Sequence, residues 1–387
     1  MKKIQLLNKI AKVGTDVFDK TAYEVSDAVT EPDAIMVRSA VMHDMEFAPN
    51  LLAIARAGAG TNNIPVDRCA EEGIVVFNTP GANANGVKEL AVAALLLASR
   101  DIAAGIEWTK TLVGNELGVA KAVEKGKSKF AGQELSGKTL GVIGLGAIGA
   151  MVANTAVALG MKVVGCDPYI SVDGAWRLST DVKKAASYDD IYASCDYITL
   201  HVPATPETKN MICAETIAKM KDGARLINLS RADLVCAADV KEAIANGKIA
   251  RYVTDFPTEE TINCEGIYTI PHLGASTEES EDNCAVMAAN ELVDYIENGN
   301  IRNSVNFPNA EMPVDGHPRL CVLHKNIPNM LASISGVVSG AGLNIENMIN
   351  RSKKDFAYTI LEASEIPENV VEVVKAIDGV IRIRVIG

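Results

Sequence analysis

The chain has 387 residues, 48% of them apolar and 22% charged, so it is long enough for two or three domains with buried cores. Its 37 Lys and Arg against 49 Asp and Glu give a net charge of -12 without a dense basic run, which argues against nucleic acid as a partner. No stretch is apolar enough for a membrane span, and 8 scattered cysteines without a C-x-x-C pair indicate a reducing cytoplasm, with no zinc site and no disulfides.

The first part of the chain alternates short apolar runs with amphipathic stretches, a rhythm typical of β-α-β units and a parallel sheet. The runs KIQLLN, AIMVRS, LAIARAG and IVVFNTP predict buried strands. Residues 87–108 are apolar nearly all round, which predicts one buried helix between domains. Residues 121–129, KAVEKGKSK, are polar and lysine-rich, so we expect a surface loop there.

A second series of strand patterns follows. Its runs are TLGVIGLG, MKVVGCD, DYITLHV, ARLINLS, ARYVTDF and IYTIPH. Beyond them, Ser276 and Glu279 have the spacing of a capping box, which predicts a helix that runs to Gly299. Residues 303–318 carry Pro and Asn without periodicity and predict a linker. The residues after it alternate as β-α-β-β-α-β, which predicts a ferredoxin-like module.

A glycine-rich turn joins the first strand of the second series to a helix. Gly144, Gly146 and Gly149 form the pattern G-x-G-x-x-G, and the next strand ends at Asp167. In a dinucleotide site these glycines allow the tight turn, the approach of the pyrophosphate and the close packing of helix on strand. A carboxylate at Asp167 suits the adenosine ribose hydroxyls and repels a 2′-phosphate. The pattern therefore predicts a Rossmann domain that binds NAD rather than a purely structural turn.

Three polar residues come shortly after strands of this predicted sheet. Arg231 follows ARLINLS, Glu259 follows ARYVTDF and His272 ends IYTIPH, so all three should lie at the carboxyl edge, where α/β sheets bind ligands. Oxidation of an alcohol by a nicotinamide needs a base for the hydroxyl proton and a cation for the substrate, roles that suit His272 and Arg231. Glu259 would orient the imidazole and favour its protonated form. Taken singly, Arg231 could be a surface ion pair and Glu259 a solvated charge, whereas His272 has no second ligand at metal-site spacing.

Several stretches resemble one enzyme family in order and spacing. GLGAIG with Asp167, NLSRADLV, DFPTEE, PHLGAST and RAGAGTNNIPVDRCAEEGIVVFNTPGANANGVKEL are similar to the D-2-hydroxyacid dehydrogenases over residues 35–300. The resemblance implies that His272 accepts the hydroxyl proton, Arg231 holds the carboxylate and Glu259 completes a catalytic trio. It implies further cofactor contacts at Ala147, Ile148, His201, Pro203, Leu229, Ser230, Asp255 and Gly274. It implies substrate contacts, between two domains, at Arg38, Ser39, Ala57, Gly58 and Asn83, with Arg38 either binding a phosphate or forming a structural ion pair.

Two positions depart from the family pattern. The family has Asp two residues before the Phe of its DVF motif, but here Thr254 stands at that position and Asp255 follows it. Phe130 occupies the place of a tryptophan that is common before the glycine-rich turn. Neither departure removes a residue of the trio.

The stretch HKNIPNMLASISGVVSGAGLNIENM, residues 324–348, resembles an ACT domain, a ferredoxin-like fold that binds amino acids at a subunit interface. By this resemblance, His324, Asn326 and Asn344 match the positions that contact the effector in serine-sensing dehydrogenases. Asn329 stands where ACT domains favour glycine, and asparagine tolerates positive φ better than most residues. The alternative is a module that dimerises and binds no ligand.

The expected fold is α/β, with a Rossmann-type doubly wound NAD domain over residues 98–282. A flavodoxin-like α/β substrate domain would cover 1–97 and 283–308, and a ferredoxin-like ACT domain of α+β class would cover 318–387. PHLGAST and the C-terminal module favour the branch of the family that oxidises 3-phospho-D-glycerate with NAD in serine synthesis, as a homodimer or homotetramer, with an L-serine effector left open. The alternatives are a glyoxylate, hydroxypyruvate or 2-oxoglutarate reductase, and an NAD-sensing co-repressor without enzyme activity.

Overall fold

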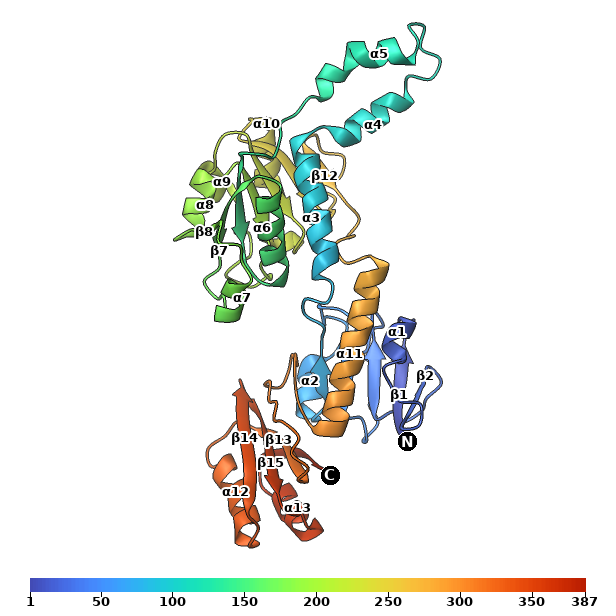
Figure 1. Ribbon diagram of the computed structural model, residues 1–387, viewed down its shortest axis with the longest axis vertical. Coiled ribbons are helices and arrows are strands. Elements are labelled where there is room, and N and C mark those ends of the chain that lie inside the picture. Colours follow the sequence, from blue (N-terminus) through green and yellow to red (C-terminus); the bar gives the residue numbers. More distant parts are fainter. The chain divides into compact units, whose positions relative to one another are not determined.

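The computed structural model describes all of residues 1–387 and divides into two compact units (Figure 1). The first unit contains Met1–Asn83 and Glu278–Gly387, and the second contains Ala84–Thr277. The first unit holds a parallel and an antiparallel sheet, whereas the second holds one parallel sheet. None of the helices combines the length and the apolar character that a membrane crossing requires.

The parallel sheet of the first unit has the strand order β2-β1-β3-β4-β5, which is the flavodoxin-like order. Four of its strands were predicted from apolar runs, but the four-residue strand β2, with sequence YEVS, is too short and polar for that pattern. The elements are β1 (Lys2–Leu7), α1 (Lys12–Thr15), β2 (Tyr23–Ser26), β3 (Ala34–Val37), β4 (Ala53–Arg56), α2 (Val66–Glu71) and β5 (Val75–Phe77).

The long helix α11 (Glu278–Asn298) packs on this sheet through small and apolar residues that include Ala285, Ala288 and Leu292 (Figure 1). The predicted end of this helix at Gly299 is confirmed. Gly299 has a φ of 74°, in the left-handed region that terminates helices. A Cβ added to Gly14 of α1 would lie 2.5 Å from the Cβ of Ala285. Only small residues therefore allow α1 and α11 to cross this closely.

The sheet of the second unit has the order β12-β11-β10-β9-β6-β7-β8, with all pairs parallel, which is the doubly wound Rossmann arrangement. The predicted strand runs are confirmed, and only the short, polar β8 was not predicted. The strands are β6 (Thr139–Ile143), β7 (Lys162–Cys166), β8 (Val182–Lys184), β9 (Tyr197–Leu200), β10 (Ala224–Asn228), β11 (Ile249–Thr254) and β12 (Ile267–Thr269). The helices around it are α3 (Ala84–Ser99), α6 (Ala147–Ala158), α7 (Val172–Trp176), α8 (Tyr188–Ser194), α9 (Ala214–Ala218), α10 (Ala237–Ala245) and the 3-10 turn η2 (Ala232–Leu234).

The prediction of one buried helix over residues 87–108 is wrong. The backbone of Asp101 leaves the helical region, with φ -81° and ψ 53°, and separates α3 from α4 (Ile102–Lys110). α3 is buried on one side, but α4 contains no buried residue. Figure 1 shows α4 and α5 extending away from the sheet of this unit. Apolar composition alone did not reveal that the second half of the pattern is exposed.

The prediction of a loop over residues 121–129 is also wrong. The structure has α5 (Val119–Gly126) and the 3-10 turn η1 (Lys127–Phe130) in this region. The rings of Trp108 and Phe130 pack with centroids 5.1 Å apart and hold η1 against α4. The helix was not predicted because its lysines and glycine outweighed the helical spacing of a few alanines and valines.

The C-terminal module has the antiparallel order β14-β15-β13-β16, as expected for a ferredoxin-like fold. Asn329, just before α12, has a φ of 69°, so asparagine does adopt the left-handed turn. The elements are β13 (Arg319–Lys325), α12 (Met330–Gly340), β14 (Ile345–Lys353), β15 (Phe356–Ala363), α13 (Glu368–Lys375) and β16 (Val380–Ile386).

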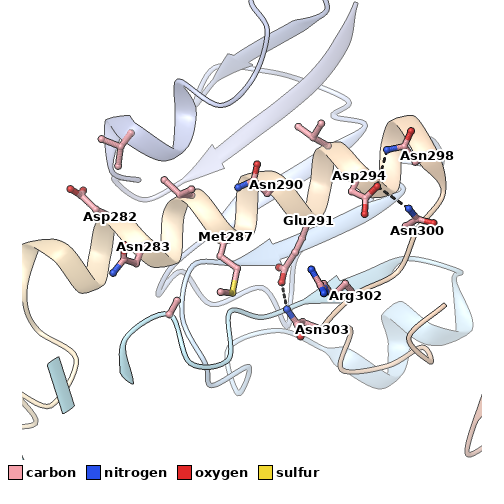
Figure 2. A pocket seen from close by; sticks show the side chains of 14 residues that line it. Asp282, Asn283, Met287, Asn290, Glu291, Asp294, Asn298, Asn300, Arg302 and Asn303 are labelled. Carbon is pink, nitrogen blue, oxygen red and sulfur yellow. Dashed lines mark hydrogen bonds between the residues drawn. The ribbon is translucent and has the colours of Figure 1, made fainter. Parts of the chain in front are cut away.

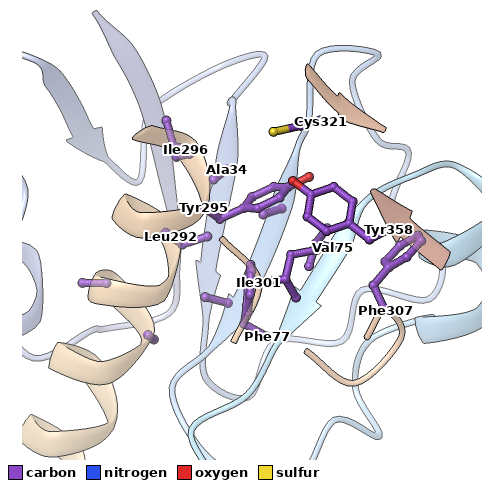
Figure 3. Close-up of a cluster of buried hydrophobic side chains, with 14 of the residues drawn as sticks. Ala34, Val75, Phe77, Leu292, Tyr295, Ile296, Ile301, Phe307, Cys321 and Tyr358 are labelled. Atoms are coloured by element: carbon purple, nitrogen blue, oxygen red, sulfur yellow. The ribbon is translucent and has the colours of Figure 1, made fainter. Parts of the chain in front are cut away.

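The segment 303–318 has no regular helix or strand, as predicted, but it is packed rather than free. Asn306 is buried, and its side chain accepts the Val76 N–H at 2.9 Å and donates to the Ile74 oxygen at 2.8 Å. Phe307 is fully buried and joins the core cluster of Figure 3, in which Tyr295 of α11 and Tyr358 of β15 also lie. The C-terminal module and the first sheet therefore share one hydrophobic core.

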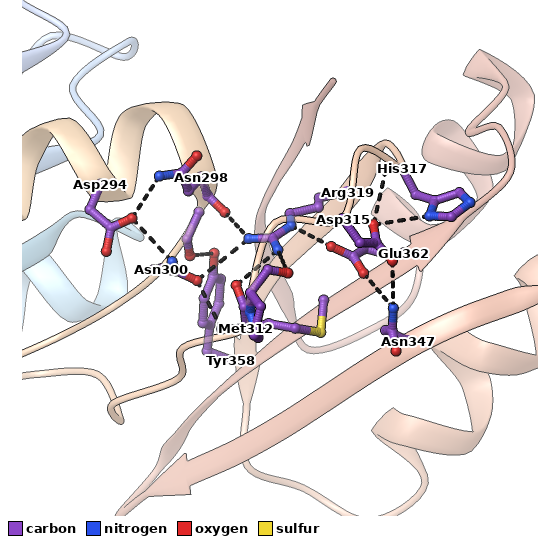
Figure 4. Close-up of polar contacts among 12 residues, drawn as sticks. Asp294, Asn298, Asn300, Met312, Asp315, His317, Arg319, Asn347, Tyr358 and Glu362 are labelled. Atoms are coloured by element: carbon purple, nitrogen blue, oxygen red, sulfur yellow. Dashed lines mark hydrogen bonds and ion pairs between the residues drawn. The ribbon is translucent and has the colours of Figure 1, made fainter.

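A buried arginine fixes the module at the end of α11 (Figure 4). Arg319 Nε donates to Glu362 Oε1 at 2.7 Å, and both side chains are at most 2% exposed. The guanidinium also donates to the main-chain oxygens of Asn298 and Met312, at 2.7 and 2.8 Å. One side chain thus links α11, the packed segment and β15.

Candidate active site

The carboxyl ends of five neighbouring strands lie level with one another in the second unit. The register pairs Ile143 with Leu200, Leu200 with Asn228, Asn228 with Thr254 and Thr254 with Thr269. Residues that come directly after these strands therefore share one edge of the sheet. The glycine-rich turn, Arg231, Asp255 and His272 all belong to the segments that leave this edge.

The glycine-rich turn is shaped by close contacts at two of its glycines. Gly144 has a φ of 88°, and a Cβ there would lie 2.4 Å from the His201 oxygen. A Cβ on Gly149 would lie 1.9 Å from the Gly144 oxygen. A Cβ added to Gly146, by contrast, would have no neighbouring atom within 4 Å. No side chain caps the N-terminus of α6, which begins at the next residue. This arrangement leaves room and free backbone N–H groups for a pyrophosphate.

We expect Gly146→Ala to lower the affinity for NAD by about tenfold or more while leaving the melting temperature nearly unchanged. The added methyl group has no protein atom within 4 Å, so it would clash only with a bound ligand. Gly149→Ala should instead lower the melting temperature, because its methyl group would strike the Gly144 oxygen. Thermal unfolding and fluorescence titration with NAD measure the two effects. Equal NAD affinity in Gly146→Ala would contradict this function of the turn.

Asp167 follows β7 and is held by backbone hydrogen bonds. Its Oδ2 accepts the Leu145 N–H at 2.8 Å, and its Oδ1 accepts the Tyr169 N–H at 2.9 Å. The first bond ties the carboxylate to the glycine-rich turn itself. The residue predicted to bind the adenosine ribose is therefore fixed beside the predicted pyrophosphate site.

His201 packs behind the turn as a neutral imidazole. Burial lowers the pKa of His201 to about 4, and its Nε2 lies 3.0 Å from the Thr199 hydroxyl. Leu229 is buried, and the Ser230 hydroxyl donates to the Leu200 oxygen at 2.7 Å. The Pro203 oxygen accepts the Thr208 hydroxyl at 2.7 Å. These predicted cofactor residues support the edge of the sheet through contacts of their own.

Arg231 is exposed at the end of the turn that follows β10. Its Nη1 donates to the Ser230 oxygen at 2.6 Å, and no carboxylate of the chain pairs with it. The buried Asn228 holds this turn, because its Nδ2 donates to the Arg231 oxygen at 2.8 Å. The guanidinium is thus available to an anionic ligand, which the surface-ion-pair alternative would not predict.

His272 adopts a left-handed backbone conformation, with a φ of 46°, that few residues other than glycine and asparagine favour. Its N–H donates to the main-chain oxygens of Asp255 and Ile270, at 3.0 and 2.9 Å. Its ring packs on Phe256 with centroids 4.7 Å apart and is otherwise exposed. The backbone therefore fixes the position of the imidazole, which is neither a core residue nor part of a metal cluster.

Glu259 is exposed and makes no hydrogen bond to His272 in this structure. Its loop is held by Thr258 and Thr261, since the Thr258 N–H donates to the Thr261 hydroxyl at 2.9 Å. The carboxylate that the structure buries beside His272 is Asp255, which is 1% exposed. The predicted pair of Glu259 and His272 is therefore not joined here.

Asp255 was predicted only as a cofactor contact, but it also organises the segment that carries His272. Its Oδ2 accepts the Gly274 N–H at 3.1 Å, while its Oδ1 is buried without a partner. Burial raises the pKa of Asp255, and the Gly274 N–H, His272 and Arg231 oppose that rise. The unusual TDF pattern was the signal in the sequence that could have indicated this role.

Four of the five predicted substrate residues directly follow the carboxyl ends of β3 and β4. Arg38 Nη2 lies 2.6 Å from Glu281 Oε1 in an exposed ion pair. The Ser39 N–H donates to Asn8 Oδ1 at 3.0 Å, and the Ala57 N–H donates to the Val37 oxygen at 2.8 Å. Gly58 has a φ of 149°, where a Cβ would lie 2.1 Å from Arg56 Nη1. Asn83 is half-buried at the end of this part of the unit.

Asn344 does not meet the other two predicted effector residues within one chain. His324 is buried in β13, with its Nε2 3.0 Å from the Thr359 hydroxyl, and burial lowers its pKa. Asn326 follows β13 and donates to the Lys354 oxygen at 2.9 Å, at the hairpin that ends β14. Asn344 precedes β14 and donates to Glu346 Oε1 at 2.9 Å. The length of β14 thus separates the two asparagines.

Comparisons with known proteins agree with this geometry. A family model described as "D-isomer specific 2-hydroxyacid dehydrogenase, NAD binding domain" matches residues 92–275. The D-3-phosphoglycerate dehydrogenase of Escherichia coli (strain K12) is 32% identical over 353 residues, which cover 88% of this chain and 82% of that protein. That of Synechocystis is 35% identical over 80% of this chain, but this chain spans only 56% of its length. The solved NAD+-bound 3-phosphoglycerate dehydrogenase of Entamoeba histolytica has a TM-score of 0.61 and 27% identity over 79% of this chain and 98% of that chain.

The chain belongs to the family of D-isomer specific 2-hydroxyacid dehydrogenases, and its cofactor is NAD. Within that family, the relatives that match it over most of their own length include bacterial and yeast enzymes named D-3-phosphoglycerate dehydrogenase.

Proposed function

We propose that the chain oxidises 3-phospho-D-glycerate to 3-phosphohydroxypyruvate with NAD, the first step of serine synthesis. The observation that carries the proposal is the level edge of the second sheet, from which the glycine-rich turn, Arg231 and His272 all extend. The names of the relatives support the choice of substrate. Residues 98–282 would act as the NAD domain, 1–97 with 283–308 as the substrate domain, and 318–387 as the regulatory domain.

The nicotinamide ring, when bound, supplies the acceptor for the hydride that leaves C2 of the substrate. His272 takes the proton of the C2 hydroxyl, and its exposed ring is free to do so. Arg231 holds the substrate carboxylate through two parallel hydrogen bonds, for which its planar guanidinium is suited. Glu259 would orient the imidazole and stabilise the positive charge that the ring gains with the proton. Asp255 keeps the His272 segment in place from both sides.

The substrate phosphate needs a cation, and Arg38 is the predicted residue. Its present partner, Glu281, is 42% exposed, so exchanging this carboxylate for a phosphate would cost little. Ser39, Ala57, Gly58 and Asn83 stay predictions for the remaining substrate contacts.

For the C-terminal module we propose an L-serine effector site shared by two copies of the chain. Asn326 and Asn344 lie at opposite ends of β14, so one small amino acid can touch both only if a second copy supplies one of them. A homodimer or homotetramer is also favoured by the α4–α5 arm, on which Ile106, Val113 and Leu117 are more than half exposed.

One assay tests substrate and effector together. Purified chain with NAD and 3-phospho-D-glycerate should produce NADH, and L-serine should lower the rate. Glycolate, glycerate and 2-hydroxyglutarate, supplied under the same conditions, should react with much lower kcat/KM. A higher kcat/KM with one of these acids would assign a different dehydrogenase of the family, and peptide binding without turnover would support the co-repressor alternative.

A further inference from the structure

A groove of about 1060 Å³ lies along α11 in the first unit, between α1 and residues 300–303 (Figure 2). None of the residues that line it belongs to the predicted catalytic, cofactor, substrate or effector residues. We call it the α11 groove. Its volume is that of a site for a small organic molecule.

The α11 groove contains a buried carboxyl group with an unused oxygen. Glu291 is 6% exposed; its Oε1 accepts Asn303 Nδ2 at 2.7 Å, whereas its Oε2 has no partner. Burial raises the pKa of Glu291 to about 8, against the opposing effects of Asn303 and Arg302. In Figure 2 the side chain reaches from α11 toward Asn303. An unpartnered buried polar atom is costly, and a ligand with N–H groups would satisfy it.

The charges around Glu291 favour a cation. Asp282 and Asp294 also line the groove, and Arg302 is its one basic residue. Arg302 Nε lies 3.5 Å from Glu311 Oε1, which neutralises part of its charge. Asp294 Oδ1 accepts Asn298 Nδ2 at 2.8 Å and Asn300 Nδ2 at 3.1 Å, so its second oxygen is left for a ligand.

The spacing of the acidic residues favours an elongated ligand. Asp282 and Glu291 are nine residues apart on α11, about 13.5 Å along the helix axis at 1.5 Å per residue. Between them, Val286 and Met287 line the groove with apolar surface. A groove with acidic residues at its ends and apolar residues between them matches a ligand with ammonium groups at its ends and methylene groups between them.

We propose that the α11 groove binds a linear aliphatic polyamine, with ammonium groups at Glu291 and Asp282 and methylene groups over Val286 and Met287. The proposal does not depend on the proposed function, because binding is measured without substrate or NAD. It concerns a ligand and a surface that the dehydrogenase reaction does not use.

Binding should depend on pH in a defined direction. An ammonium ion beside Oε2 stabilises the ionised carboxylate, so binding near neutral pH must release the proton of Glu291. The affinity should therefore rise as the pH increases toward about 8 and level off above it. Asp282, Asp294 and Arg302 are the other charged groups that line the groove.

Isothermal titration of the full chain with spermidine tests the proposal. One spermidine per chain should bind, and Glu291→Gln should weaken it by about tenfold or more and abolish its pH dependence. Glu291→Gln keeps an acceptor for Asn303, and a thermal unfolding curve checks its fold. Asp282→Asn, at a half-exposed position, should also weaken binding without risk to the core. Glu24→Gln, the same change of charge at an exposed site outside the groove, should leave it unaltered.

Several outcomes would overturn the proposal. Absence of spermidine binding would do so, as would equal affinity in Glu291→Gln and Asp282→Asn. Equal binding of 1,4-butanediol would show that the ammonium groups are irrelevant. Displacement of spermidine by an equal concentration of K⁺ would indicate a site for an inorganic cation instead.

Discussion

His272→Ala is expected to lower kcat by about 10² to 10⁴, the usual contribution of a general base, while the Kd for NAD changes little. The Kd for NAD should change little because the main-chain N–H of His272, not its ring, makes the hydrogen bonds that hold its segment. Alanine preserves those bonds and removes only the imidazole and its contact with Phe256. Stopped-flow or steady-state NADH production, together with NAD titration, measures both quantities.

A second histidine provides the matched control for this experiment. His317 is partly exposed, pairs with Asp315 at 2.9 Å, and is not one of the predicted catalytic, cofactor or substrate residues. His317→Ala should retain the kcat of the unchanged protein. Nearly full turnover in His272→Ala would remove the proton transfer from this residue, whatever the cofactor affinity.

Arg319→Leu is expected to lower the free energy of unfolding by about 3 to 5 kcal/mol, because it leaves the carboxylate of Glu362 buried without its charged partner. Glu362 is 0% exposed, and the guanidinium also satisfies the main-chain oxygens of Asn298 and Met312. The loss should appear in urea unfolding followed by circular dichroism. The lost stability should come mainly from the contact between the C-terminal module and α11.

Two comparisons separate this effect from ordinary loss of an ion pair. Lys110→Met removes one member of the exposed Lys110–Glu107 pair and should change stability little. Replacing Arg319 by Met together with Glu362 by Leu should recover part of the lost stability, since an apolar pair leaves no buried charge. Equal stability of Arg319→Leu and the unchanged protein would contradict the importance of this buried pair.

Much of the fold could be predicted from the sequence because its central strands are buried on both faces and appear as continuous apolar runs. β2 and β8 were not predicted because they are short edge strands with polar residues. The burial predicted for residues 102–108 was wrong because composition cannot tell an exposed apolar surface from a buried one, whereas α5 was not predicted because its sequence is polar and rich in lysine. The burial of Asn306 and Phe307 in a segment without periodicity likewise depends on tertiary contacts.

The candidate site was predictable in its residues but not in all of its contacts. Strand ends fix the edge from which Arg231 and His272 extend, and that follows from local pattern alone. Whether Glu259 meets His272 depends on a loop that only tertiary structure positions, and in this structure they are not bonded. The separation of Asn326 and Asn344 along β14 could not be inferred without the order of the strands.

The two backbone hydrogen bonds to Asp167 bear on any attempt to redesign the protein for NADP. Removing the carboxylate would eliminate its repulsion of a 2′-phosphate, but it would also strip the Leu145 and Tyr169 N–H groups of their acceptor. A switch of coenzyme therefore requires a replacement side chain with an oxygen that can still accept from at least one of those groups, such as serine or asparagine. A basic residue introduced nearby would then have to supply the attraction.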